Sequence, residues 1–283
     1  MGNSSRALRL SCEYFPPKTE DGKHKLLAAH DKLQALKPEF FSVTYGAGGS
    51  TRSNTRDMVL ELKRRGSCVA PHLSFGGDDE SLVLELLHVY RDNGIRRLVA
   101  LRGDMPSGMG GMSQMVYAAE LVGFVRRHTG AHFTIEVAAY PEMHPQAPDM
   151  IADVRFLKRK FDAGADSALT QFFYNADAYF RFIDACRAEG ITQPVYPGIM
   201  PILNYQNLAR FARNCGAEIP RWLHYRLESL ESDATGTREF AEEFVASLCR
   251  RLLEGGAPGL HFYTMNQAGP TLAICERLGL IHE

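Results

Sequence analysis

Short apolar runs alternate with longer amphipathic segments along the whole chain. Runs rich in β-branched and aromatic residues are typical of strands, and they occur at residues 8–14, 40–46, 68–74, 96–102, 133–140, 167–174, 194–200 and 259–266. Apolar residues recur at helical spacing at residues 18–36, 53–65, 79–93, 113–128, 149–163, 176–189, 204–214 and 237–253. Several of these helical segments run into a glycine, such as Gly66 and Gly164, and glycine is favoured where a helix ends. The pattern therefore predicts eight strands and eight helices.

The order of these elements determines the predicted fold. Eight strand–helix units in strict alternation, without a linker or a break in composition, predict an α/β protein with a single closed (β/α)8 TIM barrel. An open, doubly wound sheet is the alternative, because it is built from the same alternating units. We expect residues 8–283 to form one catalytic domain and residues 1–7 to form a flexible N-terminal tail.

Composition narrows the range of partners and compartments. The chain has 283 residues, and 32 Lys and Arg against 33 Asp and Glu give a formal net charge of -1. This balance gives no general reason to expect nucleic acid or an anionic membrane surface as a partner. The six cysteines form no CxxC pair, and no apolar run approaches the roughly 20 residues that span a membrane. We therefore expect a cytoplasmic protein with reduced thiols.

Polar residues gather where the predicted strands end. In a (β/α)8 barrel the active site is built at the carboxyl ends of the strands and in the loops that follow. Those positions carry Glu13, Thr44, Tyr45, His72, Arg102, Gly103, Asp104, Tyr140, His144, Gln171, Tyr263, Thr264 and Asn266. Because barrel closure brings all strand ends to one rim, these side chains are expected to converge on a ligand site.

Several kinds of chemistry lack their characteristic residues. No predicted strand end carries the lysine that a Schiff-base mechanism needs, and GxSxG, P-loop and GxGxxG motifs are absent. Glu13, His72, Asp104 and His144 lie on different strands without HxxxH or HxH spacing, so we predict no metal site. A metal-dependent or cofactor-free barrel lyase or hydrolase using the same carboxylates stays open, as does a binding module without catalysis.

Nine segments together resemble the methylenetetrahydrofolate reductase family. They are EYFPPKTE, FSVTYGAGGSTR, PHLS, ALRGD, VAAYPEMHP, LKRKFDAGAD, LTQFFY, PGIMPI and HFYTMN. The resemblance covers nearly the whole chain in register, and it implies a bacterial-type catalytic domain of one-carbon metabolism that serves methionine biosynthesis. It implies that bound FAD takes a hydride from NADH or NADPH and passes it to 5,10-methylenetetrahydrofolate, giving 5-methyltetrahydrofolate by a ping-pong scheme. Relatives form homo-oligomers, so a homo-oligomer is expected.

The resemblance assigns catalytic roles to two carboxyl groups. Glu13 matches the general acid that protonates N10 of the folate and opens its five-membered ring; burial should raise the pKa of this carboxyl. Alternatively, Glu13 is a strand-end residue that accepts hydrogen bonds from backbone amides. Asp104 matches an aspartate beside the flavin and the pterin, where it tunes the cofactor. From its sequence context alone, Asp104 closes a turn.

A larger set is expected to line the FAD. The cofactor-binding residues implied by the resemblance are Thr44, Tyr45, His72, Arg102, Gly103, Asp104, Tyr140, His144, Asp153 and Lys160. Arg102 and Lys160 offer cationic donors for phosphate or ribose oxygens. His72 on its own reads more simply as a hydrogen-bonded core histidine.

Four residues are expected to contact the substrates. Gln171 matches a residue used by both substrates in turn, and its amide can donate and accept; the alternative is a rim amide bonded within the protein. Phe211 matches an aromatic that stacks on either substrate, although the pattern alone favours a buried helix face. Asn207 stands where a glutamine aligns, and Gln267 replaces an arginine found in some members. These two departures concern substrate contacts rather than FAD.

Overall fold

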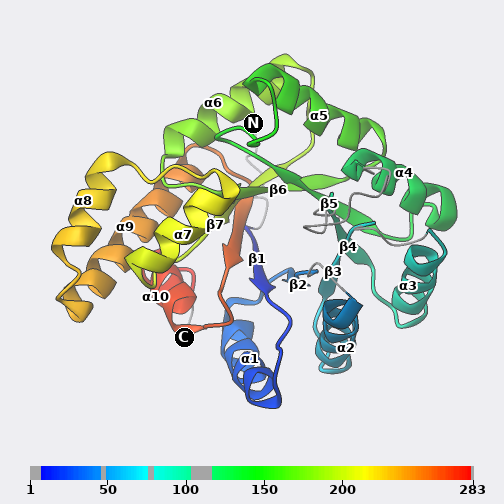
Figure 1. Ribbon diagram of the computed structural model, residues 1–283, viewed down its shortest axis with the longest axis horizontal. Coiled ribbons are helices and arrows are strands. Elements are labelled where there is room, and N and C mark those ends of the chain that lie inside the picture. The colour runs from blue at the N-terminus through cyan, green and yellow to red at the C-terminus, as the bar shows by residue number, and fades with distance from the viewer. Residues whose placement is uncertain (1–7, 46–48, 76–79, 103–116, 282–283) are drawn as a thin grey trace, which may run out of the picture.

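The parallel sheet closes on itself. The computed structural model describes residues 8–45, 49–75, 80–102 and 117–281. Its strands are β1 (Arg9–Tyr14), β2 (Phe40–Val43), β3 (Val69–Leu73), β4 (Arg97–Ala100), β5 (Thr134–Ala139), β6 (Ser167–Phe172), β7 (Val195–Ile199) and β8 (Gly259–Tyr263). Each strand pairs in parallel with the next, and β8 pairs with β1 (Figure 1). The predicted closed barrel is confirmed, and an open doubly wound sheet is excluded.

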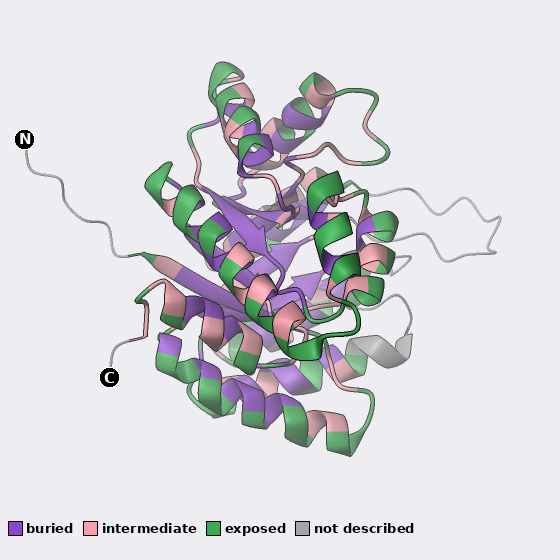
Figure 2. Ribbon diagram, turned by 90° about the vertical axis from the view of Figure 1, so that its left-hand side faces the viewer, coloured by how far each residue is buried: buried purple, intermediate pink, exposed green. Residues whose placement is uncertain are grey.

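Helices surround the barrel. They are α1 (Glu20–Leu33), the short η1 (Gln34–Leu36), α2 (Gly49–Arg64), α3 (Glu80–Asp92), α4 (Ala118–Thr129), α5 (Met150–Asp162), α6 (Ala176–Ala188), α7 (Tyr205–Cys215), α8 (Arg221–Ser229), α9 (Ala234–Glu254) and α10 (Gly269–Arg277). Figure 2 shows the buried strands at the centre and helices whose exposed faces point outward. This is the division that amphipathic helices around a parallel sheet require.

The prediction that strands and helices alternate strictly is wrong after β7. Three helices, α7, α8 and α9, connect β7 to β8, and α10 follows β8. The predicted segment 237–253 is α9, whereas α8 and α10 were missed. Helix α8 buries only Leu223 and Leu227, and it exposes the aromatic side chains of Trp222 and Tyr225. Only the two leucines mark its buried face, because the aromatic residues of α8 lie on its exposed side.

Local sequence signals place the helix ends near the barrel rims. Asp149 caps α5 by accepting a hydrogen bond from the backbone N–H of Ala152, at 2.8 Å. After α5 the chain turns at Gly164, whose φ of +113° is rarely adopted by residues with a side chain. A Cβ there would also lie 2.9 Å from the Arg126 side chain, whose guanidinium donates to the Gly164 carbonyl. Glycine thus fits both the turn and the contact.

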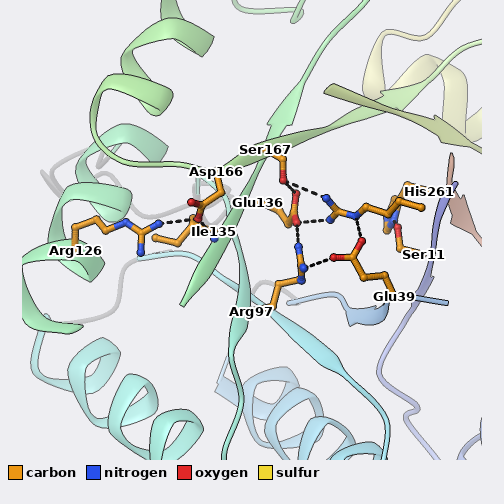
Figure 3. Close-up of polar contacts among 10 residues, drawn as sticks. Ser11, Glu39, Arg97, Arg126, Ile135, Glu136, Asp166, Ser167 and His261 are labelled. Carbon is orange, nitrogen blue, oxygen red and sulfur yellow. Dashed lines mark hydrogen bonds and ion pairs between the residues drawn. The ribbon is translucent and has the colours of Figure 1, made fainter. Parts of the chain in front are cut away.

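A charged layer fills the amino end of the barrel. The Glu136 carboxylate is fully buried and accepts hydrogen bonds from Arg9, Arg97 and Ser167. Figure 3 shows Glu136 between Arg97 and Ser167, with Glu39 bridging the two arginines from the outer side. Such a group is stable only because each buried charge is paired.

A thin apolar layer separates this charged layer from the carboxyl end. It consists of the inward side chains Phe40, Ala70, Val99, Leu169 and Tyr196. The Arg9 guanidinium lies 3.9 Å from the centre of the Tyr196 ring, in cation–π geometry. The barrel interior is therefore a packed core, as expected for eight strands. Among the described helices, none is both long and apolar enough to cross a membrane.

Candidate active site

Glu13 lies inside the carboxyl end of the barrel with three polar neighbours. Its Oε2 atom lies 3.0 Å from Nε2 of His72 and 3.3 Å from Nε2 of His261. Ser42 donates a hydrogen bond from Oγ to the same oxygen, at 3.1 Å. The His72 contact is an ion-pair distance whose angle is poor for a hydrogen bond. A carboxyl and two imidazoles thus share one small buried space.

Barrel closure produces this cluster from distant parts of the sequence. Glu13 is in register with Ser42 on β2 and with Tyr263 on β8, so β1 stands between its two neighbouring strands. The Glu13 carbonyl accepts hydrogen bonds from Thr264, through Oγ1 at 2.7 Å and the backbone N–H at 3.3 Å. His261 is held from its other ring nitrogen, Nδ1, which lies 2.8 Å from Oγ of Ser11. The carboxyl group and its neighbours are therefore fixed in position.

The two imidazoles determine the charge of Glu13. Burial acts to raise the pKa of this carboxyl and is the largest single influence, as the sequence predicted. Attraction to His72 and hydrogen bonding with His261 together outweigh burial and hold the pKa well below its ordinary value. The expectation of a raised pKa is therefore wrong, because the sequence did not place His72 and His261 against this carboxyl. The Glu13 carboxylate thus faces the ring nitrogens of two imidazoles.

A second cluster lies where β5 runs into α5. The rings of Tyr140 and His144 meet edge to face, with centroids 4.6 Å apart. The His144 backbone N–H donates to Oδ2 of the buried Asp153, at 2.8 Å, and burial raises the pKa of Asp153. Lys160 donates from Nζ to the carbonyl of Ala138, at 2.8 Å. The structure thus brings together four of the residues predicted to bind FAD.

The cations of this cluster are partly withdrawn from water. Burial lowers the pKa of Lys160 to about 8, although attraction to Asp153 opposes the change. Arg102, just after β4, donates from Nη1 to Oε1 of Gln146, at 2.6 Å. Burial lowers the pKa of His144, and repulsion from Lys160 and Arg102 adds to this effect. These groups suit an anionic ligand that lies along the ends of β4 and β5.

The remaining residues that were predicted to bind the cofactor lie in different parts of the rim or outside the described residues. Thr44 and Tyr45 follow β2 and are half-buried, and the Thr44 carbonyl accepts a hydrogen bond from Thr55 Oγ1 at 2.8 Å. His72, also predicted to bind FAD, is buried and contacts Glu13. Gly103 and Asp104 lie outside the described residues. Within the described ranges, no group of three His, Cys, Asp or Glu side chains is arranged to hold a metal ion.

The four predicted substrate residues are spread over β6, α7 and the segment after β8. Gln171 on β6 is half-buried, and its Oε1 accepts a hydrogen bond from the backbone N–H of Phe172. On α7, Asn207 is exposed and accepts a bond from Arg210, whereas Phe211 packs against the main core. Gln267 is exposed and borders a cavity of about 370 Å³ between the start of α7 and the helices α8 to α10.

Sequence reasoning missed three residues of the site. Ser11, Ser42 and His261 complete the surroundings of Glu13. Tyr263, which the sequence placed at the rim, lies beside His261 with its ring edge on, 5.2 Å between centroids. The available signal was alternation: inward positions of a strand carry every second residue, and polar residues there stand out against an apolar barrel interior. That rule would have selected Ser11, Glu13, His261 and Tyr263 together.

Fold and site define a (β/α)8 barrel with a buried carboxyl–imidazole cluster at the carboxyl ends of its strands, where barrel enzymes carry their active sites. The family model for methylenetetrahydrofolate reductase matches residues 3–279. The chain belongs to the methylenetetrahydrofolate reductase family.

Individual relatives agree with this assignment. The chain is 40% identical over 274 residues to the 5,10-methylenetetrahydrofolate reductase of Salmonella typhimurium, covering 96% of this chain and 91% of that protein. It is 39% identical over 274 residues to the Escherichia coli protein of the same name, again covering 96% of this chain and 91% of that protein. For methylenetetrahydrofolate reductase (NADH) 1 of Arabidopsis thaliana the corresponding figures are 38% over 291 residues, 96% and 48%. A solved structure with TM-score 0.67 and 16% identity, covering 96% of both chains, is an uncharacterized protein from Clostridium thermocellum that binds two copies of 5-methyl-5,6,7,8-tetrahydrofolic acid.

Proposed function

We propose that the protein reduces 5,10-methylenetetrahydrofolate to 5-methyltetrahydrofolate, using bound FAD and hydride from NADH or NADPH. The observation that carries the proposal is the buried carboxyl–imidazole cluster of Glu13, His72 and His261 at the carboxyl rim of a family barrel. The names of the bacterial relatives supply the substrate, and the plant relative's name makes NADH the first donor to test.

The reaction needs a proton donor, and the cluster can supply one. Opening the folate's five-membered ring requires protonation of N10, which leaves an electrophilic iminium at N5. A proton held among Glu13 and its two imidazoles can be placed on Glu13 when a ligand displaces water and strengthens the effect of burial. Ser42 and the fixed His261 keep the carboxyl in one orientation while this happens. Glu13 is therefore the proposed general acid, and His72 and His261 set its protonation.

The residues around β5 and α5 fit the proposed cofactor. Lys160 uses one of its N–H groups on the Ala138 carbonyl, and within the described part of the chain its other two make no hydrogen bond. Together with Arg102 it offers cationic donors for a pyrophosphate, while Tyr140 and His144 offer ring faces and edges. When bound, FAD supplies hydride transfer between the nicotinamide nucleotide and the folate. Because one site would serve both substrates, we expect ping-pong kinetics.

An anaerobic visible spectrum tests the proposal. Purified protein, loaded with FAD if necessary, is titrated with NADH and then with 5,10-methylenetetrahydrofolate. Bleaching of the oxidised-flavin bands by NADH and their return with the folate are expected. A colourless protein that takes up no FAD, or an activity that requires an added divalent metal, would contradict the proposal. Bands that respond to NADPH but not to NADH would correct the donor only.

A further inference from the structure

The edge between β6 and β7 is irregular at one point. Leu169 pairs with Tyr196, but the next pair is Phe172 with Gly198, so β6 carries one more residue than β7 over this interval. The extra residue makes a β-bulge at Thr170–Gln171. Bulges next to active sites change the direction of a side chain and leave backbone groups without their ladder partner. Gln171, a predicted substrate contact, is therefore placed by this bulge.

Side chains replace the interrupted ladder. Tyr263, from β8, donates a hydrogen bond from its hydroxyl to the Thr170 carbonyl, at 2.6 Å. The backbone N–H of Gly198, from β7, donates to the Thr170 hydroxyl, at 2.8 Å. Burial raises the pKa of Tyr263 well above its ordinary value, so the phenol keeps the proton that it donates. Three strands are thus joined at Thr170.

Gly198 makes room for this arrangement. A Cβ at position 198 would lie 2.1 Å from the Thr170 carbonyl oxygen and 2.6 Å from Cε2 of Tyr263. Both distances are far shorter than real contacts, and one of the opposing atoms is backbone that cannot easily move. Any larger residue at position 198 would displace Thr170 and Tyr263 together.

The bulge also prepares the Gln171 amide. Its Oε1 atom accepts from the Phe172 backbone N–H at 3.0 Å, and its Nε2 makes no hydrogen bond within the described residues. An amide held by its oxygen presents its N–H₂ group as a donor. A carbonyl is the matching group on a ligand, and both the nicotinamide carboxamide and the pterin ring carry one.

We propose that Tyr263 is a positioning residue, which holds the Thr170–Gln171 bulge so that the Gln171 amide can donate to a carbonyl of either substrate. The proposal rests on the proposed function for the identity of the two substrates. Tyr263 acts through Gln171, so its loss should weaken ground-state binding of both substrates more than it slows the chemical steps.

Steady-state kinetics of Tyr263→Phe test this. Loss of one neutral hydrogen bond predicts a rise in KM of about threefold to tenfold for both the nicotinamide nucleotide and the folate, with kcat little changed. Tyr179→Phe is the matched control, because Tyr179 also donates from its hydroxyl to a backbone carbonyl of the barrel, that of Val195 at the amino end of the neighbouring strand β7, at 2.8 Å. The control should lose a similar amount of thermal stability without a change in either KM.

A double-mutant cycle separates positioning from direct contact. In a Gln171→Ala background, Tyr263→Phe should raise neither KM further, because the residue through which it acts is gone. Additive effects of the two substitutions, or an effect on one substrate alone, would overturn the proposal.

Crystal structures of the Tyr263→Phe and Tyr179→Phe variants give a readout without activity. A Thr170–Gln171 bulge that is displaced in Tyr263→Phe but not in Tyr179→Phe supports the proposal. A bulge that has not moved in Tyr263→Phe overturns it. If the wild-type protein oxidises neither NADH nor NADPH, the proposed function fails, and this structural comparison still decides the role of Tyr263.

Discussion

Oε2 of Glu13 lies 3.0 Å from Nε2 of His72, although the two residues come from strands that are not neighbours in the sheet. The contact crosses the barrel interior and leaves the carboxyl group dependent on an imidazole for its charge. Substitutions at the two ends of this contact should therefore change different steps.

Glu13→Gln keeps the size of the side chain but replaces the carboxyl group with an amide that cannot act as an acid. We expect reduction of the flavin by NADH to be nearly unchanged, while reduction of the folate falls by about 10²- to 10⁴-fold, the usual contribution of a general acid. Stopped-flow measurement of the two half-reactions checks this. Ser42→Ala, which removes one hydrogen bond but keeps the acid, should cause a much smaller loss. An equal loss in both half-reactions would rule out the acid role.

His72→Asn should raise the pKa of Glu13. Burial favours the protonated carboxyl, and attraction to His72 is the strongest influence against it. With that imidazole gone, His261 and the Ser42 hydroxyl are the described contacts that still favour the carboxylate. Infrared difference spectra across a pH series report the protonated carboxyl, assigned by its loss in Glu13→Gln. His132→Asn, far away beside Ile95, serves as control and should leave the band unchanged; an unchanged titration in His72→Asn would refute the assignment.

Lys160 should make the stability of the FAD-free protein depend on alkaline pH. Its pKa is lowered to about 8, so between pH 8 and its ordinary value of 10.5 the unfolded chain binds a proton that the folded chain does not. The contribution of Lys160 to the free energy of unfolding therefore rises with pH from about 8 to 10.5. Below pH 8 the buried ammonium destabilises the folded protein by its full amount. Lys160→Met should stabilise the FAD-free protein at neutral pH, with a gain that shrinks towards pH 10.5, and should weaken FAD binding.

Urea unfolding of the FAD-free proteins at a series of pH values measures this difference. Lys158→Met is the control on the same helix, because Lys158 pairs with Asp162 at 2.9 Å near the surface. A gain that is the same at every pH, or that also occurs in Lys158→Met, would contradict the role given to the buried charge.

Glu136→Gln should destabilise the fold without touching the site. Removing the buried countercharge leaves Arg9 and Arg97 inside the barrel, which costs about 3–5 kcal/mol of unfolding free energy. Glu39→Gln removes a carboxylate that contacts the same two arginines but is 42% exposed, so we expect about 0–1 kcal/mol. Equal losses in urea unfolding would mean that burial of Glu136 is not what makes it important.

The strands were predictable because short runs rich in β-branched and aromatic residues alternate with amphipathic helical segments along the chain. Helix α8 was not, since Trp222 and Tyr225 face outward and only two leucines mark its buried side. Helix α10 begins with Gly269 and Pro270, which read as a turn in a sequence. The spacing of apolar residues indicates which side of an element is buried. It therefore fails for helices in which large apolar side chains are exposed.

The site was predictable in part for the same reason. Position at a strand end selected Glu13, and the effect of burial on its pKa followed from that position. The partner that reverses the effect, His72, lies on β3, and His261 lies on β8, which meets β1 only when the sheet closes. Contacts that closure creates between distant strands cannot be read from local periodicity.

Among the described residues, the apolar layer of Phe40, Ala70, Val99, Leu169 and Tyr196 fills the barrel interior on the amino side of Glu13. Protons, like ligands, must then reach Glu13 from the carboxyl rim, since the opposite end is sealed by packed rings and paired charges. A substrate lying across that rim would close the route by which the acid is recharged from solvent. Each turnover would therefore draw on a proton loaded before the folate arrived, and solvent exchange at Glu13 would wait for product to leave.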